Sequence, residues 1–210
     1  YPGGKSRAVP KLLQWLPSRE ITEYREPFLG GGSMAIEMTR RLPEEVPIWV
    51  NDLYEPLMNF WSNLQMFGGE LYTELKNLKI TNCNQDSARC LFAEMKDVVN
   101  DKTKTDLERA VAFYVVNKCS FSGLTESSSF SAQASDSNFS MRGIEKLPEY
   151  SEIISHWHIN QYSYEYCFRT DVHDGLFMYL DPPYDIKDNL YGNKGSMHKK
   201  FDHDKFAADC

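Results

Sequence analysis

The chain has 210 residues, of which 41% are hydrophobic and 25% charged, a composition typical of a globular protein with a substantial core. No apolar run approaches the roughly 18 residues that a membrane helix needs, and the first residues lack the pattern of a signal peptide. The formal charge of −7 argues against a protein that coats nucleic acid by bulk charge, although it leaves room for a nucleic-acid enzyme with a local basic path.

The cysteines and histidines indicate neither a disulfide framework nor a metal centre. The five cysteines are widely spaced and no two form a Cys-x-x-Cys pair, so we expect reduced thiols in an intracellular protein. They are Cys83, Cys90, Cys119, Cys167 and Cys210. His156 and His158 would share one face of a strand, but no third ligand lies near them in sequence. We therefore expect no bound metal.

The chain starts with a Gly-Pro loop at residues 1–5, which is too flexible to form regular structure without a partner. Residues 11–16 then show the apolar spacing of a short helix. Pro17 is expected to end this helix, because proline cannot continue one. The first strand is expected after it.

A strand, a glycine turn, a helix and a second strand are predicted next. Residues 24–29 form the predicted strand and run into Gly30, Gly31 and Gly32. Ser33 is expected to cap a helix that continues through about residue 41. The second strand, Ile48–Val50, is short and buried and closes on Asn51 and Asp52. This spacing is that of a βαβ unit.

The middle of the chain has a different character. Residues 70–78, 86–99 and 106–116 have helical apolar spacing. Serine dominates residues 120–140, and we expect a long loop or hairpin there, because its side chains are too small to make a core.

Strand signals return at residues 157–164 and 176–180, and the second of these runs directly into Asp181-Pro182-Pro183-Tyr184. The α/β pattern is therefore interrupted by a helical and loop insertion. No internal repeat is visible.

The glycine turn is the first candidate ligand site. Gly30 to Ala35 fits the G-x-G-x-x-G/A pattern between a strand and a helix, and Asp52 ends the next strand. Glycines let the backbone approach a ligand, and a carboxylate at Asp52 can hydrogen-bond the two hydroxyls of a ribose. The pattern does not separate NAD from S-adenosylmethionine, since both carry an adenosine ribose, and a tight turn without a ligand also fits it.

The segment Asp181-Pro182-Pro183-Tyr184 is more specific, because it suits a planar amine. The prolines stiffen the segment and leave carbonyl oxygens free of strand pairing. The Asp181 carboxylate can accept one hydrogen of an exocyclic amino group, and a carbonyl of the Pro-Pro step can accept the other. Withdrawing both hydrogens favours a pyramidal, nucleophilic nitrogen, while the Tyr184 ring can stack on the base.

Five segments together resemble the Dam-type DNA N6-adenine methyltransferases, the alpha group with the DPPY motif. These segments are Tyr1–Lys5 (YPGGK), Glu26–Ser33 (EPFLGGGS), Asn51-Asp52, Asn117–Leu124 (NKCSFSGL) and Asp181–Tyr184 (DPPY). They occur in the order of that family, and the resemblance spans the whole chain.

The resemblance implies an α/β fold with a Rossmann-like S-adenosylmethionine-dependent methyltransferase sheet. The catalytic domain would be discontinuous, formed by residues 1–55 and 146–210. Residues 56–145 would be a mainly helical target-recognition insertion with a loop or hairpin over 118–142. Relatives continue with more strands beyond the DPPY motif, so the C-terminal part of the sheet is expected to be missing at Cys210.

The resemblance also assigns roles to residues. Those expected to act in catalysis are Asp181, Pro182, Pro183 and Tyr184. Those expected to bind the methyl donor are Tyr1, Pro2, Lys5, Phe28, Gly30, Gly32, Ser33, Asp52, Ser163, Tyr164 and Asp181. In this assignment Phe28 and Gly30 line the methionine end of the donor, and Ser163-Tyr164 stands where relatives carry an acidic-aromatic pair.

DNA contact requires local positive charge, which the sequence offers in three places. Lys5 and Arg7 lie in a basic N-terminal stretch, and Lys194 and Lys199 follow the DPPY segment in a basic, glycine-containing one. The serine-rich segment is the best candidate for groove entry. Its candidate contacts are Lys118, Ser120, Ser122 and Arg142.

We therefore expect a site-specific DNA adenine methyltransferase that flips its target base and uses S-adenosylmethionine, forming S-adenosylhomocysteine, without a metal. Cytosine N4 methylation, an inactive truncated DNA-binding remnant and, more distantly, an NAD-dependent oxidoreductase remain alternatives. Duplex DNA is the expected partner, and a cognate restriction endonuclease is a further candidate. The expected protein is a monomer in a bacterial or virus-infected cytoplasm, associated with DNA and not with membranes.

Overall fold

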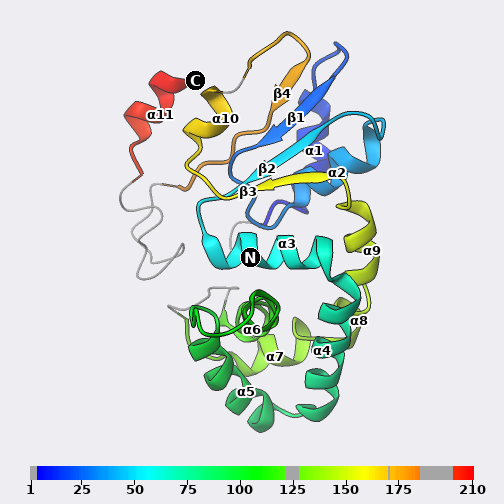
Figure 1. Ribbon diagram of the computed structural model, residues 1–210, viewed down its shortest axis with the longest axis vertical. Helices are drawn as coiled ribbons and strands as arrows, with labels where there is room; N and C mark the ends of the chain where they lie inside the picture. Colours follow the sequence, from blue (N-terminus) through cyan, green and yellow to red (C-terminus); the bar gives the residue numbers. More distant parts are fainter. Residues whose placement is uncertain (1–3, 122–127, 170, 185–200) are drawn as a thin grey trace.

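The computed structural model describes residues 4–121, 128–169, 171–184 and 201–210 and shows a mixed α/β protein (Figure 1). Four strands form one sheet in the order β3-β2-β1-β4, with every neighbouring pair parallel. The strands are β1 (Glu23–Glu26), β2 (Ile48–Asn51), β3 (Trp157–Asn160) and β4 (Leu176–Met178). In register, Tyr24 of β1 lies opposite Ile48 of β2 and Phe177 of β4.

The strand order creates a switch point beside β1. From β1 the chain proceeds to β2 and β3 on one side, whereas β4 adds to the other side of β1. Ligands of open parallel sheets bind outside the carboxyl ends of the strands, at the point where the order reverses. The residues that follow Glu26 and Met178 therefore lie where a ligand site is expected.

Helices cover both faces of the sheet, and successive side chains of β1, which point to opposite faces, contact them. The Arg25 guanidinium donates to the carbonyl oxygens of Cys167 (2.7 Å) and Asp171 (2.9 Å), at and just beyond α10 (Glu165–Arg169). On the other face the Tyr24 hydroxyl donates to Glu26 (2.6 Å), which also accepts the backbone N–H of Ala35 in α2 (Ser33–Arg41). The remaining helices near the sheet are α1 (Val9–Leu12), the 3-10 turn η1 (Leu13–Trp15), α9 (Leu147–Ile153) and α11 (His203–Asp209).

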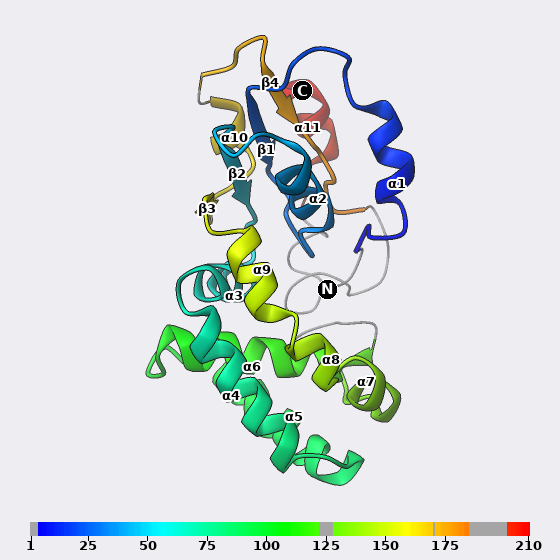
Figure 2. The same ribbon diagram turned by 90° about the vertical axis from the view of Figure 1, so that its right-hand side faces the viewer.

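A second group of helices, the helical block, lies below the sheet in Figure 1. It consists of α3 (Glu55–Met66), α4 (Gly68–Thr81), α5 (Gln85–Val98), α6 (Asp106–Cys119), α7 (Ala132–Ser137) and α8 (Met141–Ile144). Capping boxes start α5 at Asn84 and α6 at Thr105. Ten of the 14 residues of α6 are buried, which makes it the central helix of the block. Figure 2 shows α9 at the side where the block meets the sheet, and α9 contacts α2, α3 and α4.

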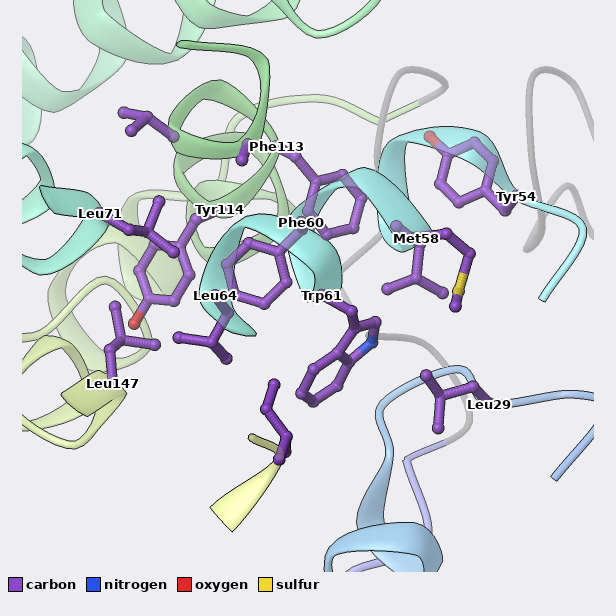
Figure 3. Close-up of a cluster of buried hydrophobic side chains, with 14 of the residues drawn as sticks. Leu29, Tyr54, Met58, Phe60, Trp61, Leu64, Leu71, Phe113, Tyr114 and Leu147 are labelled. Carbon is purple, nitrogen blue, oxygen red and sulfur yellow. The ribbon is translucent and has the colours of Figure 1, made fainter. Parts of the chain in front are cut away.

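The core is continuous from the sheet into the helical block. Side chains of α3 lie at its centre, and Figure 3 shows Phe60, Trp61 and Leu64 between α6 and the loop that carries Leu29. The Phe60 ring lies 5.7 Å from that of Phe113, centroid to centroid. Such aromatic packing fixes α3 against α6, and α3 therefore sets the position of the block relative to the sheet.

A partly buried ion pair adds to this contact between α3 and α6. The Arg109 side chain is only 4% exposed, and its Nη2 lies 2.5 Å from Glu55 Oε2. Arg109 also pairs with Asp106 (3.1 Å), while Lys102 approaches Glu55 from the surface (2.9 Å). These positive charges lower the pKa of Glu55, against the opposing effect of its partial burial.

The structure confirms both strands of the predicted βαβ unit and the three predicted helices of the middle region. The strands predicted over 24–29 and 176–180 end earlier, at Glu26 and Met178, and the helix predicted over 11–16 is α1 followed by η1. Other details are also corrected. Gly32 and not Ser33 is the N-cap of α2, and no side chain caps this helix through its N-cap position. The serine-rich segment is not a loop throughout, because residues 132–137 are helical and Phe139 is fully buried in the core. The strand predicted over 157–164 ends at Asn160.

Among the helices of the described residues, none combines the length and the apolar character that crossing a membrane requires.

Candidate active site

A cavity of about 320 Å³ lies at the switch point, outside the carboxyl ends of β1, β2 and β4. It brings together three segments that are far apart in sequence: the glycine turn, the residues after β3 and the DPPY segment. Its walls are formed by Gly4, Lys5, residues 26–34, Asp52, Leu53, residues 162–165, Tyr179, Asp181, Pro183, Phe201, Asp202 and Lys205.

The glycine turn forms the cavity wall between β1 and α2. Gly30 (φ 48°) and Gly32 (φ 64°) both adopt the left-handed backbone conformation, which other residues rarely adopt. The turn is closed by a hydrogen bond from the Gly32 N–H to the Leu29 carbonyl (2.8 Å). Backbone geometry thus explains the glycines at positions 30 and 32, and the turn leaves bare backbone facing the cavity.

Asp52 holds this turn from the end of β2. One carboxylate oxygen accepts the N–H of Gly30 (2.9 Å), and the other accepts the N–H of Tyr54 (3.0 Å). Burial raises the pKa of Asp52, and the backbone donors only partly oppose this effect. Since each carboxylate oxygen can accept more than one hydrogen bond, Asp52 retains the capacity to bind hydroxyl groups in the cavity.

Glu26, which sequence reasoning did not assign, lies at the floor of the same cavity. It is 2% exposed, and burial raises its pKa to about 8, while the hydrogen bond from Tyr24 acts in the opposite direction. The negative charges of Asp181 and Asp52 raise it further. Glu26 is the last residue of β1, and an acidic residue at the strand end that faces ligands was the signal that could have identified it.

The DPPY segment contributes a carboxylate and a phenol that contact each other. The Tyr184 hydroxyl donates to Asp181 Oδ1 (3.0 Å), and the Lys5 ammonium donates to Asp181 Oδ2 (2.6 Å) and to the Tyr184 hydroxyl. Partial burial disfavours the charge of Lys5, but these hydrogen bonds outweigh it and raise the pKa of Lys5. The carboxylate is therefore held in place by a lysine that stays protonated.

Aromatic side chains close the opposite end of the cavity. The Phe28 ring lies 5.6 Å from Tyr164 and 5.5 Å from Phe206 of α11. Phe201 contacts both Phe28 and Tyr164, and Lys205 donates to the Tyr164 hydroxyl (3.3 Å). The cavity is thus lined both by aromatic rings around Phe28 and by the acidic side chains of Asp181, Glu26 and Asp52.

Most of the predicted donor and catalytic residues surround this cavity. Those that line it are Lys5, Phe28, Gly30, Gly32, Ser33, Asp52, Ser163, Tyr164, Asp181 and Pro183. Tyr184 joins them through its hydrogen bonds, and Pro182 lies between Asp181 and Pro183 in the same segment. Tyr1 and Pro2 lie outside the described residues.

The predicted DNA contacts are dispersed. Arg7 and Arg142 are exposed, whereas Lys118 is half-buried, with its Nζ 5.5 Å from the centre of the Tyr114 ring. Burial lowers the pKa of Lys118. Ser120 is fully buried and its hydroxyl donates to the Asn117 carbonyl (3.1 Å), so its side chain does not face solvent as a DNA contact would. Ser122, Lys194 and Lys199 lie outside the described residues.

The thiols and the histidines of the described residues form no metal site. All five cysteines are free, and burial raises the pKa of Cys119 to about 12 and that of Cys167 to about 11, which keeps these thiols protonated. His158 stacks on Trp49, with ring centroids 4.2 Å apart. Within the described ranges no cluster of three metal-ligating side chains occurs.

Comparison with known proteins agrees with this geometry. The DNA N-6-adenine-methyltransferase of Escherichia phage P1 is 30% identical over 125 residues, which are 60% of this chain and 15% of that protein. The type II methyltransferase M.MjaIII of Methanocaldococcus jannaschii is 25% identical over 133 residues, 59% of this chain and 45% of that protein. The type II methyltransferase M1.LlaDCHI of Lactococcus lactis subsp. cremoris is 24% identical over 194 residues, which are 88% of this chain and 64% of that protein. The chain spans less than two thirds of the length of each of these relatives.

A family model matches the whole chain, residues 1–210, and covers both the sheet and the helical block. This match separates the chain from nicotinamide-dependent oxidoreductases, which have only the glycine turn in common with it. Since the model spans every segment that meets at the cavity, the chain belongs to the D12 class of N6 adenine-specific DNA methyltransferases.

Proposed function

We propose that this protein transfers a methyl group from S-adenosylmethionine to the N6 amino group of adenine in DNA. The observation that carries the proposal is the Asp181 carboxylate, held by Lys5 and Tyr184 beside a cavity that the glycine turn encloses. An acceptor for an amine and a backbone cradle for an adenosyl ligand therefore lie in one site.

The cavity fits the methyl donor in size and in charge. Its volume of about 320 Å³ lies within the range of roughly 300–1,000 Å³ that small-molecule sites occupy. S-adenosylmethionine, when bound, supplies a methyl group on a positively charged sulfur that an amine can attack. The carboxylates of Asp52 and Asp181 favour such a cation, and we assign Asp52 to the ribose hydroxyls and the Phe28 and Tyr164 rings to the apolar part of the donor.

The DPPY segment would hold the amine that accepts the methyl group. Asp181 accepts one hydrogen of the amino group, because a carboxylate has about four acceptor positions and only two are used by Lys5 and Tyr184. A proline carbonyl of the same segment accepts the second hydrogen. The Tyr184 residue is 44% exposed, which leaves ring surface on which a base can stack.

The amine of a paired adenine is inaccessible to such a pocket, so the base must be flipped out of the duplex at a cost of a few kcal/mol. We propose that the helical block, within residues 56–145, is the target-recognition part and that residues 1–55 and 146–210 form the catalytic part. The exposed Arg7 and Arg142 and the half-buried Lys118 are the described candidates for phosphate contact. Ser122, Lys194 and Lys199 stay predictions from the sequence.

We further propose duplex DNA as the partner, a monomer as the acting form and a DNA-associated cytoplasmic location. Two of the relatives are named type II methyltransferases, which supports the proposal that a cognate restriction endonuclease accompanies this protein.

The proposal is tested by measuring the rate at which the protein transfers a labelled methyl group from S-adenosylmethionine to genomic DNA whose adenines carry no methyl groups. We expect Asp181→Asn to lower the transfer rate by about 10²–10³-fold, because the amide presents a donor where the amine needs an acceptor. The exposed Asp204→Asn is the matched control and should transfer at the wild-type rate. An Asp181→Asn variant that folds and transfers at the wild-type rate would refute the assignment.

A further inference from the structure

Trp61 of α3 reaches out of the helical block to the glycine turn. Its indole N–H donates to the carbonyl oxygen of Gly30 (3.2 Å). The N–H of the same glycine donates to Asp52 (2.9 Å), so Gly30 is held on both sides, by the sheet through Asp52 and by the helical block through Trp61. Figure 3 shows the Trp61 side chain extending from α3 toward the loop that carries Leu29.

The Trp61 ring also packs directly on the backbone of the turn. A Cβ atom placed on Gly32 would lie only 2.8 Å from Trp61 Cζ2 and 3.0 Å from Cη2, closer than real side chains approach each other. Two features therefore require glycine at position 32: its left-handed φ of 64°, and the indole of Trp61, which leaves no room for a side chain. Trp61 is only 6% exposed, which shields its hydrogen bond to Gly30 from water.

The glycine turn is the shared wall of two cavities. Gly30, Gly31 and Ser33 line the donor cavity on one side and a second cavity of about 500 Å³ on the other. Trp61 lines the second cavity and is absent from the walls of the first. Trp61 thus supports the turn from behind, on the side that faces the helical block.

We propose that Trp61 is a positioning residue that sets the affinity for the methyl donor by holding the Gly30–Gly32 turn in its binding conformation. The inference rests on the proposed function, since it assumes that the donor binds against this turn. Its physical basis is the freedom of glycine: three consecutive glycines sample many backbone conformations, and each contact that fixes them lowers the entropy lost on binding. A core tryptophan without this role would affect stability only.

Trp157 provides the matched control for this proposal. It is also buried (4% exposed), and its indole N–H also makes one hydrogen bond, to the Thr39 hydroxyl (2.7 Å). It lies beside Trp61, with ring centroids 5.6 Å apart, but it makes no contact with the glycine turn among the contacts described. Trp61→Phe and Trp157→Phe each remove one indole N–H and comparable volume from the same part of the core.

The experiment compares S-adenosylhomocysteine binding by calorimetry in the wild type and the two variants, with thermal melting to confirm folding. We expect Trp61→Phe to raise the Kd by about 3- to 10-fold, the value of one buried hydrogen bond, and Trp157→Phe to leave it within 2-fold of the wild type. Equal Kd values for Trp61→Phe and the wild type, or equal losses in both variants, would overturn the proposal while leaving the proposed function intact. Absence of binding by the wild type would instead overturn the donor site itself.

Backbone hydrogen exchange gives a second readout that needs no ligand. We expect the amides of Gly30–Gly32 to exchange faster in Trp61→Phe than in Trp157→Phe when each variant is measured at the same number of degrees below its own melting temperature. Unchanged exchange at the turn in Trp61→Phe would contradict the positioning role, even if the variant were too unstable for calorimetry.

Discussion

The buried Glu26 should make the protein less stable as the pH rises through neutrality. Its pKa is raised from 4.5 to about 8 by burial in the folded protein, whereas an unfolded chain has the ordinary value. Between these pH values the folded state binds more protons than the unfolded state, so stability falls as the pH increases. At about 1.4 kcal/mol for each pH unit the whole interval has an upper bound of about 5 kcal/mol, of which about 3 kcal/mol falls between pH 5 and pH 8.

Glu26→Gln removes this titration while it keeps the size of the side chain. The variant lacks one acceptor oxygen near Tyr24 and Ala35, which costs a constant amount at every pH. We therefore expect the unfolding free energy of the variant to increase by about 3 kcal/mol relative to the wild type from pH 5 to pH 8, measured by urea denaturation. The exposed Glu44→Gln should show no such trend. A difference between Glu26→Gln and the wild type that is the same at every pH would refute the reasoning.

Three further predictions follow from other contacts. Arg109→Met should destabilise the protein by about 1–3 kcal/mol in urea denaturation, because it removes the ion pair with the partly exposed Glu55 and leaves the carbonyl of the buried Val99 without the Arg109 donor; a loss below about 0.5 kcal/mol would mean that these contacts contribute nothing. The same pair lowers the pKa of Glu55, so its contribution to stability is present above the ordinary glutamate pKa and should disappear as the pH falls. The difference in unfolding free energy between the wild type and Arg109→Met, measured by urea denaturation, should therefore be smaller at pH 3 than at pH 7. Arg142→Gln should weaken DNA binding and reduce the slope of log K against log salt by about one, in titrations at several salt concentrations, if the arginine contacts a phosphate; an unchanged slope would remove Arg142 from the DNA interface.

The segments that meet at the cavity could be located from the sequence because each is defined by a local pattern. Gly30 and Gly32 make a left-handed turn, and the DPPY segment is a rigid run of acceptors. Each lies a few residues after a short strand, β1 or β4. The switch-point order of the sheet then brings them to one cavity.

Residues that act through distant partners were not predictable in this way. Trp61 has the spacing of an ordinary core residue, and only the packing of α3 on the turn shows that its N–H meets Gly30. Phe139 lies in a serine-rich stretch without helical periodicity, yet tertiary packing buries it completely. Phe201 and Phe206 contact Phe28 across more than 170 positions of sequence, a pairing that no local pattern encodes.

The central claim is that the cavity at Asp181 methylates the N6 amino group of adenine. The most direct measurement is mass analysis of the nucleosides released from DNA after incubation with the protein and S-adenosylmethionine. We expect N6-methyladenine as the product with the wild type and its loss with Asp181→Asn. Methylation of cytosine, or N6-methyladenine formed equally by both proteins, would contradict it.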